Sequence, residues 1–334
     1  MDRTITRLQE RGVTRRELLG SACATALSLA TARVVQAEPD RGNPVRIVDS
    51  HVHVWDLKQF RLPWLDHDPL LNRDFSVADY REAAAGLNVT SAVYVEVNVE
   101  PGQRGTEARY VAELCRKPDS IFAAGVIAAD PRDPGLGEFL DRFRDRSELK
   151  GVRFLYPRDG SRDPLFLRGV RLLGERKMTF DLQLGPPLLA DAAAVVAACP
   201  ETQFVLDHCG GAVPKPFRRE FDNDPAVLAQ RDTWRRGIEG MAKHSNVACK
   251  ISGVADAAMP GDATAEDVAP LVNFCLDQFG PDRVLFGGNW PVCLKGSTLR
   301  HWVESLKTVV AQRSAADQQK LFRENALRVY RVVK

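Results

Sequence analysis

The sequence has no long uninterrupted apolar run and no large excess of one charge. Its apolar N-terminal stretch, residues 18–35, is interrupted by Arg33 and falls short of the roughly 20 apolar residues that a transmembrane helix needs. The 334 residues include 46 basic and 44 acidic side chains, which gives a formal charge of +2. This balance does not indicate binding to nucleic acid or to an anionic membrane surface.

Signals that would divide the chain are also missing from the sequence. The seven cysteines are scattered and form no Cys-x-x-Cys pair, which argues against a tight disulfide framework. No proline-rich linker, low-complexity tract or internal repeat interrupts residues 38–334. We therefore expect residues 38–334 to form a single domain, with six cysteines that are buried free thiols.

Residues 1–37 have the features of a twin-arginine export signal. Arg15 and Arg16 are followed by a modestly apolar stretch, and Val35-Gln-Ala37 offers small residues for cleavage before Glu38. The segment contains six arginines and three acidic residues, so the remainder has a formal charge of −1. We expect the twin-arginine export machinery to deliver a folded protein, without a membrane anchor in its mature form, to the periplasm or the medium. An ordinary N-terminal helix is the alternative.

Residues 38–334 alternate short β-branched apolar runs with stretches of helical spacing. The predicted strands are 46–51, 90–97, 121–128, 151–155, 179–184, 203–207, 247–251 and 283–286. The predicted helices are 76–86, 106–116, 136–145, 165–177, 188–198, 225–244, 265–279 and 299–312, followed by 314–330. Ser76 with Asp79 and Thr264 with Asp267 are typical start signals of helices.

Eight strand–helix units predict a (β/α)₈ TIM barrel, an α/β fold whose right-handed crossovers bury a parallel sheet. An open doubly wound sheet is the alternative, but no Gly-rich phosphate loop follows the first strand. In a TIM barrel the chemistry lies at the carboxyl ends of the strands. The polar side chains at those ends are therefore the candidates for a functional site.

Three histidines stand at predicted strand ends. His51 and His53 are two residues apart, and the strand period of two places both on one face. His208 follows strand 203–207 and precedes Gly210 and Gly211, which allow a sharp turn beside a ligand. Taken separately, a His-x-His pair or a single His is often structural. Together, three neutral imidazoles on one rim fit a divalent metal, with zinc as the first choice.

Other residues at the strand ends are candidates for binding a substrate. Arg153 and Lys250 could hold a carboxylate or hydroxyl groups, and an internal ion pair of Lys250 with Asp49 or Glu96 is the alternative. Asp49 is expected to share the face of the two histidines, and Asp207 is expected to face the opposite way from His208. Further substrate-binding candidates are Trp55, Trp64, Tyr156, Gln183 and Trp290.

Several of these residues fall within longer segments that match a known family in order. The segments are Val48-Asp-Ser-His-Val-His-Val-Trp55, Leu62-Pro-Trp-Leu65, Lys150-Gly-Val-Arg-Phe154, Leu206-Asp-His-Cys-Gly210, Asn246-Val-Ala-Cys-Lys-Ile-Ser-Gly253 and Phe279-Gly-Pro-Asp-Arg-Val-Leu-Phe-Gly-Gly-Asn-Trp-Pro291. With them the chain resembles the amidohydrolase-related superfamily, in the group similar to L-fuconolactonase and 2-pyrone-4,6-dicarboxylate lactonase. The resemblance covers essentially all of residues 38–334 and implies a TIM-barrel hydrolase that opens lactones.

One residue departs from the pattern of that family. Asn289 stands where the family usually has Asp, which the resemblance implies to be a general base and, where a metal is present, commonly a ligand. A neutral amide cannot take a proton from water. Either another group is the base, or a metal alone activates the water, or the reaction is not ordinary hydrolysis. In this chain Asn289 is expected to orient water or substrate.

The leading hypothesis is an exported hydrolase that opens the ring ester of a small lactone, derived from a sugar acid or from an aromatic breakdown product. His51, His53, His208 and Asn289 are the predicted catalytic residues. The three histidines would hold zinc or, without a metal, polarise the carbonyl. A decarboxylase or lactone isomerase on the same barrel is one alternative, and a non-catalytic binding protein is another. The expected ligand is a small lactone or carboxylate, with no nucleic acid.

Overall fold

A computed structural model describes residues 45–256 and 264–332 of the chain, so the predicted export signal at residues 1–37 lies outside the described part. Eight parallel strands form one sheet in the order β1 to β8. They are β1 (Ile47–Val52), β2 (Val89–Val95), β3 (Phe122–Ala128), β4 (Leu149–Leu155), β5 (Thr179–Gln183), β6 (Gln203–Leu206), β7 (Val247–Ile251) and β8 (Val284–Phe286). The predicted barrel is confirmed, and each predicted strand begins and ends within two residues of the observed one.

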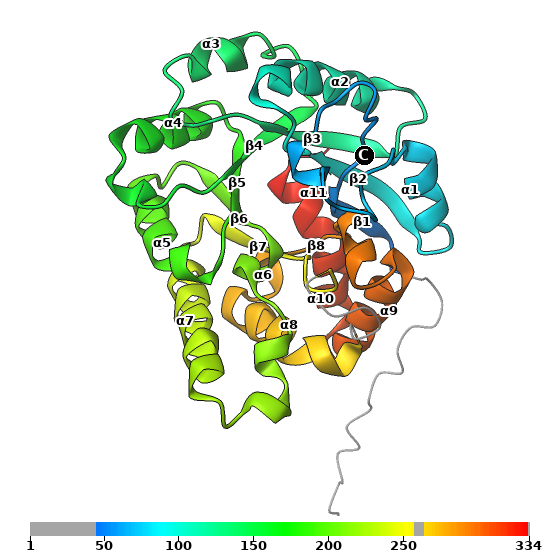
Figure 1. Ribbon diagram of the computed structural model, residues 1–334, viewed down its shortest axis with the longest axis vertical. Helices are drawn as coiled ribbons and strands as arrows, with labels where there is room; N and C mark the ends of the chain where they lie inside the picture. Colours follow the sequence, from blue (N-terminus) through cyan, green and yellow to red (C-terminus); the bar gives the residue numbers. More distant parts are fainter. Residues whose placement is uncertain (1–44, 257–263, 333–334) are drawn as a thin grey trace, which may run out of the picture. The chain divides into compact units, whose positions relative to one another are not determined.

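Helices alternate with the strands and surround them (Figure 1). They are α1 (Val77–Ala83), α2 (Arg104–Arg116), α3 (Leu136–Asp141), α4 (Pro164–Glu175), α5 (Leu189–Ala198), α7 (Pro225–Ala242), α8 (Ala265–Phe279) and α9 (Leu299–Val309). The Ser76 and Thr264 side chains cap α1 and α8 as expected, each accepting a backbone hydrogen bond three residues on. The predicted helix 314–330 is instead divided into α10 (Ala315–Gln319), a wider π turn (Lys320–Glu324) and α11 (Asn325–Val329).

A small apolar cluster fills the barrel interior. Val93 and Val95 of β2 and Val126 of β3 point into it, and Ala326 of α11 and the adjoining Tyr330 join it from the chain's end. The Asn325 amide of α11 donates to the carbonyl of Val284, the first residue of β8, at 2.8 Å, so the C-terminal segment closes the amino-terminal end of the barrel. The opposite end, where the strands lead into the βα loops, is left for a site.

The barrel closes where β1 meets the segment that follows β8. The Asn289 amide donates to the His51 carbonyl at 2.8 Å, and the His53 amide donates to the Trp290 carbonyl at 2.8 Å. The Ser50 hydroxyl also donates to the Phe286 carbonyl at 2.6 Å. Because β8 has only three residues, much of the seam lies beyond its end. This seam holds residue 289 beside His51 of β1 and His53, which follows the strand.

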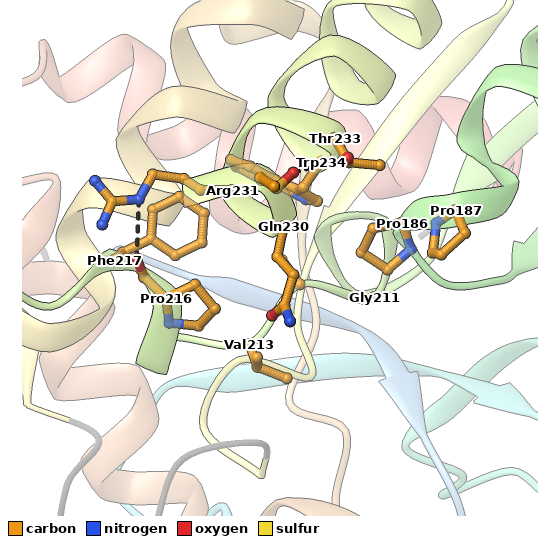
Figure 2. Close-up of a pocket in the computed structure, with 12 residues that line it drawn as sticks. Pro186, Pro187, Gly211, Val213, Pro216, Phe217, Gln230, Arg231, Thr233 and Trp234 are labelled. Atoms are coloured by element: carbon orange, nitrogen blue, oxygen red, sulfur yellow. Dashed lines mark hydrogen bonds between the residues drawn. The ribbon is translucent and has the colours of Figure 1, made fainter. Parts of the chain in front are cut away.

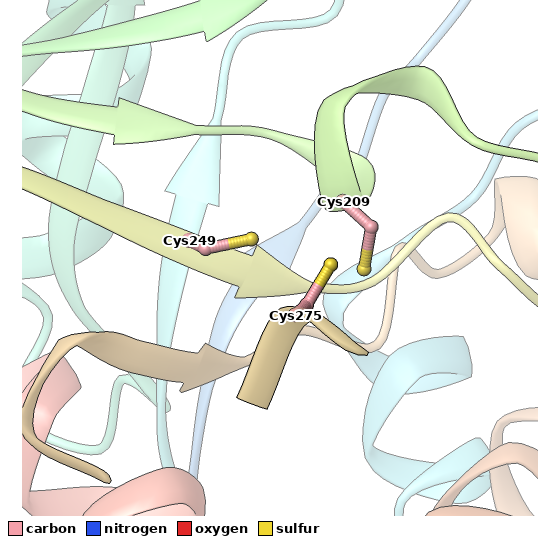
Figure 3. A group of neighbouring side chains, drawn as sticks. All are labelled: Cys209, Cys249 and Cys275. Atoms are coloured by element: carbon pink, nitrogen blue, oxygen red, sulfur yellow. The ribbon is translucent and has the colours of Figure 1, made fainter. Parts of the chain in front are cut away.

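The described cysteines are free thiols, as expected, and all of them except Cys115 are buried. Cys209, Cys249 and Cys275 converge between β7 and α8, with their sulfur atoms within 4.8 Å of one another (Figure 3). Cys209 directly follows His208, so these thiols fill the space behind the turn that carries it. Within residues 45–256 and 264–332, no helix is both long enough and apolar enough to cross a membrane.

Candidate active site

An irregularity in β1 turns His51, and with it His53 just beyond the end of the strand, into the barrel. Asp49 pairs with Ala92 and Val52 pairs with Tyr94, so three steps on β1 match two steps on β2. The extra residue is a β-bulge, which changes the face to which the following side chains point. As a result Asp49 and Val52 both face the helices, and His51 faces the interior.

The bulge makes the expectation for Asp49 wrong, because this carboxylate does not share the face of the histidines. Its Oδ2 atom accepts a hydrogen bond from the Tyr80 hydroxyl of α1 at 3.0 Å. Its Oδ1 atom accepts from the backbone amides of His51 at 3.1 Å and of Gly288 at 2.7 Å. Asp49 therefore ties β1 to α1 and to the segment after β8 from outside the sheet.

His208 reaches the same mouth through a left-handed turn. It begins α6 (His208–Gly211), whose four residues have φ values of 54°, 52°, 69° and 71°. This conformation is uncommon for residues other than glycine and costs energy that the surroundings must supply. The His208 Nδ1 atom lies 2.9 Å from the Ser252 hydroxyl. A Cβ on Gly253 would lie 2.5 Å from the His208 ring, so a glycine is required there.

The three predicted imidazoles meet at the carboxyl end of the barrel. The Nε2 atoms of His51 and His53 are 3.2 Å apart, and the ring centres of His51 and His208 are 4.5 Å apart. His53 Nδ1 lies 2.8 Å from the Val95 carbonyl, which only accepts, so we assign the proton to Nδ1 and a lone pair to Nε2. Burial lowers the pKa of His53 to about 3, and the charge of Arg153 acts in the same direction. His53 is therefore neutral at physiological pH.

The donor atoms at this mouth fit a divalent ion. Two nitrogens bound to one zinc at about 2.0–2.1 Å with a tetrahedral angle stand ~3.3 Å apart, close to the His51–His53 spacing. The ligand atoms of His51, Asp207 and His208 also lie within 4.8 Å of one another. The charges of Arg153 and Lys250 are close to these donors and weaken the attraction for a dication.

Arg153 of β4 lies at the floor of the mouth in a fixed orientation. Its Nε atom donates to Glu96 Oε1 at 2.6 Å, and one Nη atom donates to the Glu96 carbonyl at 2.7 Å. The other Nη atom is 3.4 Å from His51 Nε2. This last Nη group also lies 3.8 Å from Asp207 Oδ2, so the guanidinium is held between Glu96, His51 and Asp207.

Lys250 does not line the cavity, because it is fully buried below it. Its ammonium is 2.6 Å from Asp181 Oδ2 and 3.1 Å from Asp207 Oδ1, so the ion-pair alternative holds with different partners from those expected. The expectation that Asp207 faces away is wrong, since its Oδ1 also lies 3.6 Å from His51 Nδ1. Burial alone would raise the pKa of Asp207, but Lys250 and then His51 hold it well below its usual value.

A cavity of about 320 Å³ opens above these groups. The predicted site residues that line it are His53, Trp64, Arg153, Gln183, His208 and Asn289. Trp64 is 37% exposed and its indole N–H donates to the Val97 carbonyl at 2.8 Å, which holds the ring at the rim. Its face and the Gln183 amide give the cavity one apolar and one polar wall.

Three predicted aromatic residues are buried in the packing and do not line the cavity. The Trp55 indole donates to the Arg73 carbonyl at 2.7 Å, and Trp290 packs against Phe75. The Tyr156 hydroxyl donates to a carboxylate of α5, Asp191, at 2.5 Å. These side chains support the loops around the mouth.

Asp256 was not among the residues predicted from the sequence, and it lines the same cavity. Asn289 Nδ2 donates to Asp256 Oδ2 at 3.1 Å. Asp256 stands three residues after Gly253, in the loop that follows β7, next to the loop that carries Asn289. Two signals in the sequence were available. Asp256 is an acid close to the end of the predicted strand 247–251, and Asn289 is a neutral amide at a position where an acid was expected.

A second groove, of about 530 Å³, lies between α7 and the segments after β5 and β6 (Figure 2). Its walls are mainly apolar and include Pro186, Pro187, Phe217 and Trp234. None of the predicted site residues lines it. The histidine cavity is therefore the place for chemistry.

Comparison with known proteins gives matches that span most of the chain. L-fucono-1,5-lactonase from Burkholderia multivorans is 30% identical over 300 residues, which cover 85% of this chain and 95% of that protein. Two crystal structures of an amidohydrolase from Burkholderia multivorans are similar, each covering 86% of this chain and 100% of that chain. One has bound HEPES, with a TM-score of 0.74 and 26% identity, and the other has bound zinc, with a TM-score of 0.72 and 24% identity. The amidohydrolase family model matches residues 48–332, so the chain belongs to the amidohydrolase family and is a hydrolase.

Proposed function

We propose that this hydrolase opens the ring ester of a small lactone of the sugar-acid type. The observation that carries the proposal is that His53, His208 and Arg153 line one cavity and that His51 contacts all three of them from below. Uncharged imidazoles and a fixed cation suit the activation of a carbonyl group. The similarity to a protein named L-fucono-1,5-lactonase supports the sugar-acid class.

Arg153 would stabilise the negative charge that develops on the carbonyl oxygen when water attacks. Its guanidinium is already oriented by Glu96, so little reorganisation is needed during the reaction. Because the Arg153 side chain is only 5% exposed, bulk water screens its charge weakly. Trp64 and Gln183 would contact the hydroxylated ring of the substrate from the sides of the cavity.

We propose zinc as the cofactor, held by His51, His53 and His208. The support is the 3.2 Å spacing of the His51 and His53 nitrogens, and the donor atoms of His51, His208 and Asp207, which lie within 4.8 Å of one another. When bound, zinc supplies Lewis acidity toward the lactone carbonyl oxygen. The zinc bound in the amidohydrolase structure from Burkholderia multivorans supports this choice. Without a metal, Arg153 and the imidazoles would polarise the carbonyl, and the experiment below separates the two cases.

The test is a panel of five- and six-membered sugar lactones incubated with the purified full chain, with the products followed by NMR. Zinc content is measured, and the assay is repeated after chelation and after zinc is returned. We expect conversion to the open hydroxy acid, with a loss of at least tenfold on chelation that zinc reverses. Release of carbon dioxide, ring migration or no turnover would contradict the lactonase. Full activity in metal-free protein would contradict the proposed zinc cofactor and leave the proposed lactonase activity standing.

We also propose export to the periplasm through the twin-arginine machinery. The support is the Arg15-Arg16 pair, the apolar stretch behind it and the small residues at Val35-Gln-Ala37. Cell fractionation of the wild-type chain and of an Arg15→Lys/Arg16→Lys variant tests this proposal. We expect periplasmic protein beginning at Glu38 for the wild type and cytoplasmic precursor for the variant. An equal distribution of the two would contradict it.

A further inference from the structure

The cavity contains one carboxylate to which the roles above assign nothing. Asp256 lines it together with His53, Arg153 and His208. Its Oδ2 atom accepts the hydrogen bond from Asn289 Nδ2 at 3.1 Å. Its Oδ1 atom is buried and has no hydrogen-bond partner among the described residues. One oxygen of the carboxylate is thus held in place, and the other keeps an unshared lone pair in a residue that lines the cavity.

The other acidic groups near the mouth are engaged elsewhere. Glu96 accepts from Arg153 and, at 2.6 Å, from the backbone amide of Asn98, and Asp207 is paired with Lys250. Neither Glu96 nor Asp207 is part of the cavity lining, in which Asp256 is the one carboxylate among the described residues. Imidazoles that hold a metal ion have no free lone pair on the bound nitrogen.

Asn289 explains why Asp256 keeps a fixed position. An amide N–H group donates to Oδ2, whereas a second carboxylate at this distance would repel it and force one of the two acids to stay protonated. An amide at position 289 therefore gives Asp256 a hydrogen-bond donor without a second negative charge beside it. Asn289 and Asp256 are therefore complementary as donor and acceptor.

We propose that Asp256 is the general base of the ring-opening reaction, an inference that rests on the proposed lactone hydrolysis. Asp256 Oδ1 takes a proton from water while the water oxygen forms a bond to the lactone carbonyl carbon. The ring C–O bond then breaks, and the ring oxygen takes the proton from Asp256. Lactone and water thus give one hydroxy acid, and the carboxylate is regenerated. Asn289 is a positioning residue that acts through Asp256.

The experiment compares four proteins on a lactone that the wild type opens. They are wild type, Asp256→Asn, the exchange variant Asp256→Asn/Asn289→Asp, and Asp277→Asn as a control on the exposed face of α8, where the Asp277 side chain is 63% exposed. Asp256→Asn should lower kcat at least ~100-fold with KM within about threefold, because the amide has the shape of the carboxylate but accepts no proton. The exchange variant returns a carboxylate to the cavity and should recover at least ~10-fold of the loss.

A second readout separates proton transfer from a structural role. In Asp256→Ala, added formate fits the space left by the side chain and should raise kcat at least ~10-fold, with no effect on Asp277→Asn. This variant also decides the question if Asp256→Asn does not fold. The proposal is overturned if Asp256→Asn keeps more than a third of the wild-type kcat, or if neither the exchange nor formate restores activity. A wild type that opens no lactone would overturn the proposed function and this inference together.

Discussion

Replacing Gly253 by alanine should disable the site by moving His208. An added Cβ would stand 2.5 Å from the His208 ring, and an ordinary contact begins at 3.4 Å, so the ring must move by about 0.9 Å. A misplacement of ~1 Å in a catalytic group costs on the order of 100-fold in rate, which is the loss in kcat that we expect. The φ of +66° at Gly253 adds a backbone cost of about 1–2 kcal/mol to folding.

Gly280→Ala is the matched control for this substitution. Gly280 has a φ of +71°, but no atom lies within 4 Å of the Cβ that alanine would add. Both variants should lose a few degrees of melting temperature in thermal unfolding because of the positive φ, while only Gly253→Ala, which also displaces the His208 ring, loses lactone turnover. A crystal structure of Gly253→Ala would show the moved ring directly. The reasoning fails if Gly253→Ala turns over within threefold of Gly280→Ala.

Three further predictions concern the charged groups around the site. Lys250→Met leaves Asp181 without its buried partner and should reduce the free energy of unfolding by about 3–5 kcal/mol in denaturant titrations; a change below about 1 kcal/mol would contradict the buried ion pair. Burial raises the pKa of Glu107 from 4.5 to about 8, so the folded state keeps a proton that the unfolded state loses, and stability should fall as pH rises from 4.5 to 8. Glu107→Gln has no carboxyl group to ionise, so its melting temperature should fall less than that of the wild type over this pH range. The same pH dependence in both proteins would contradict the assignment of this effect to Glu107. Arg153→Lys loses the two-point contact with Glu96 and should lower kcat/KM on the order of 100-fold. A kcat/KM within threefold of the wild-type value would exclude a role for the guanidinium.

The two acidic residues that flank the site show where sequence reasoning stopped. Val205 points into the barrel, and the period of two carries Asp207 to the same side. By that rule His208 should face outward, but the left-handed turn at residues 208–211 returns it to the mouth. The expectation for Asp207 was wrong because it assumed that only one of two consecutive residues could face inward.

Asp49 was misplaced for a related reason. A strict alternation would put Asp49 and His51 on one face of β1, and the bulge between Asp49 and Val52 separates them. A bulge depends on how the neighbouring strand pairs, and the residues of β1 alone do not reveal it. The strands themselves could be predicted well because each is a short apolar run between polar or glycine-rich turns.

The sequence by itself determined the order of eight strands and their helices, and it singled out the three imidazoles, since hydrophobic periodicity and side-chain chemistry are local properties of the chain. Only the tertiary structure decided which acids reach the cavity. Asp256 and Asn289 are 33 residues apart in the chain, and their contact exists because adjacent strands bring two loops to one rim. Beyond the strand ends no periodic rule orients a side chain, so the partners of the histidines depend on turns, a bulge and the seam of the barrel.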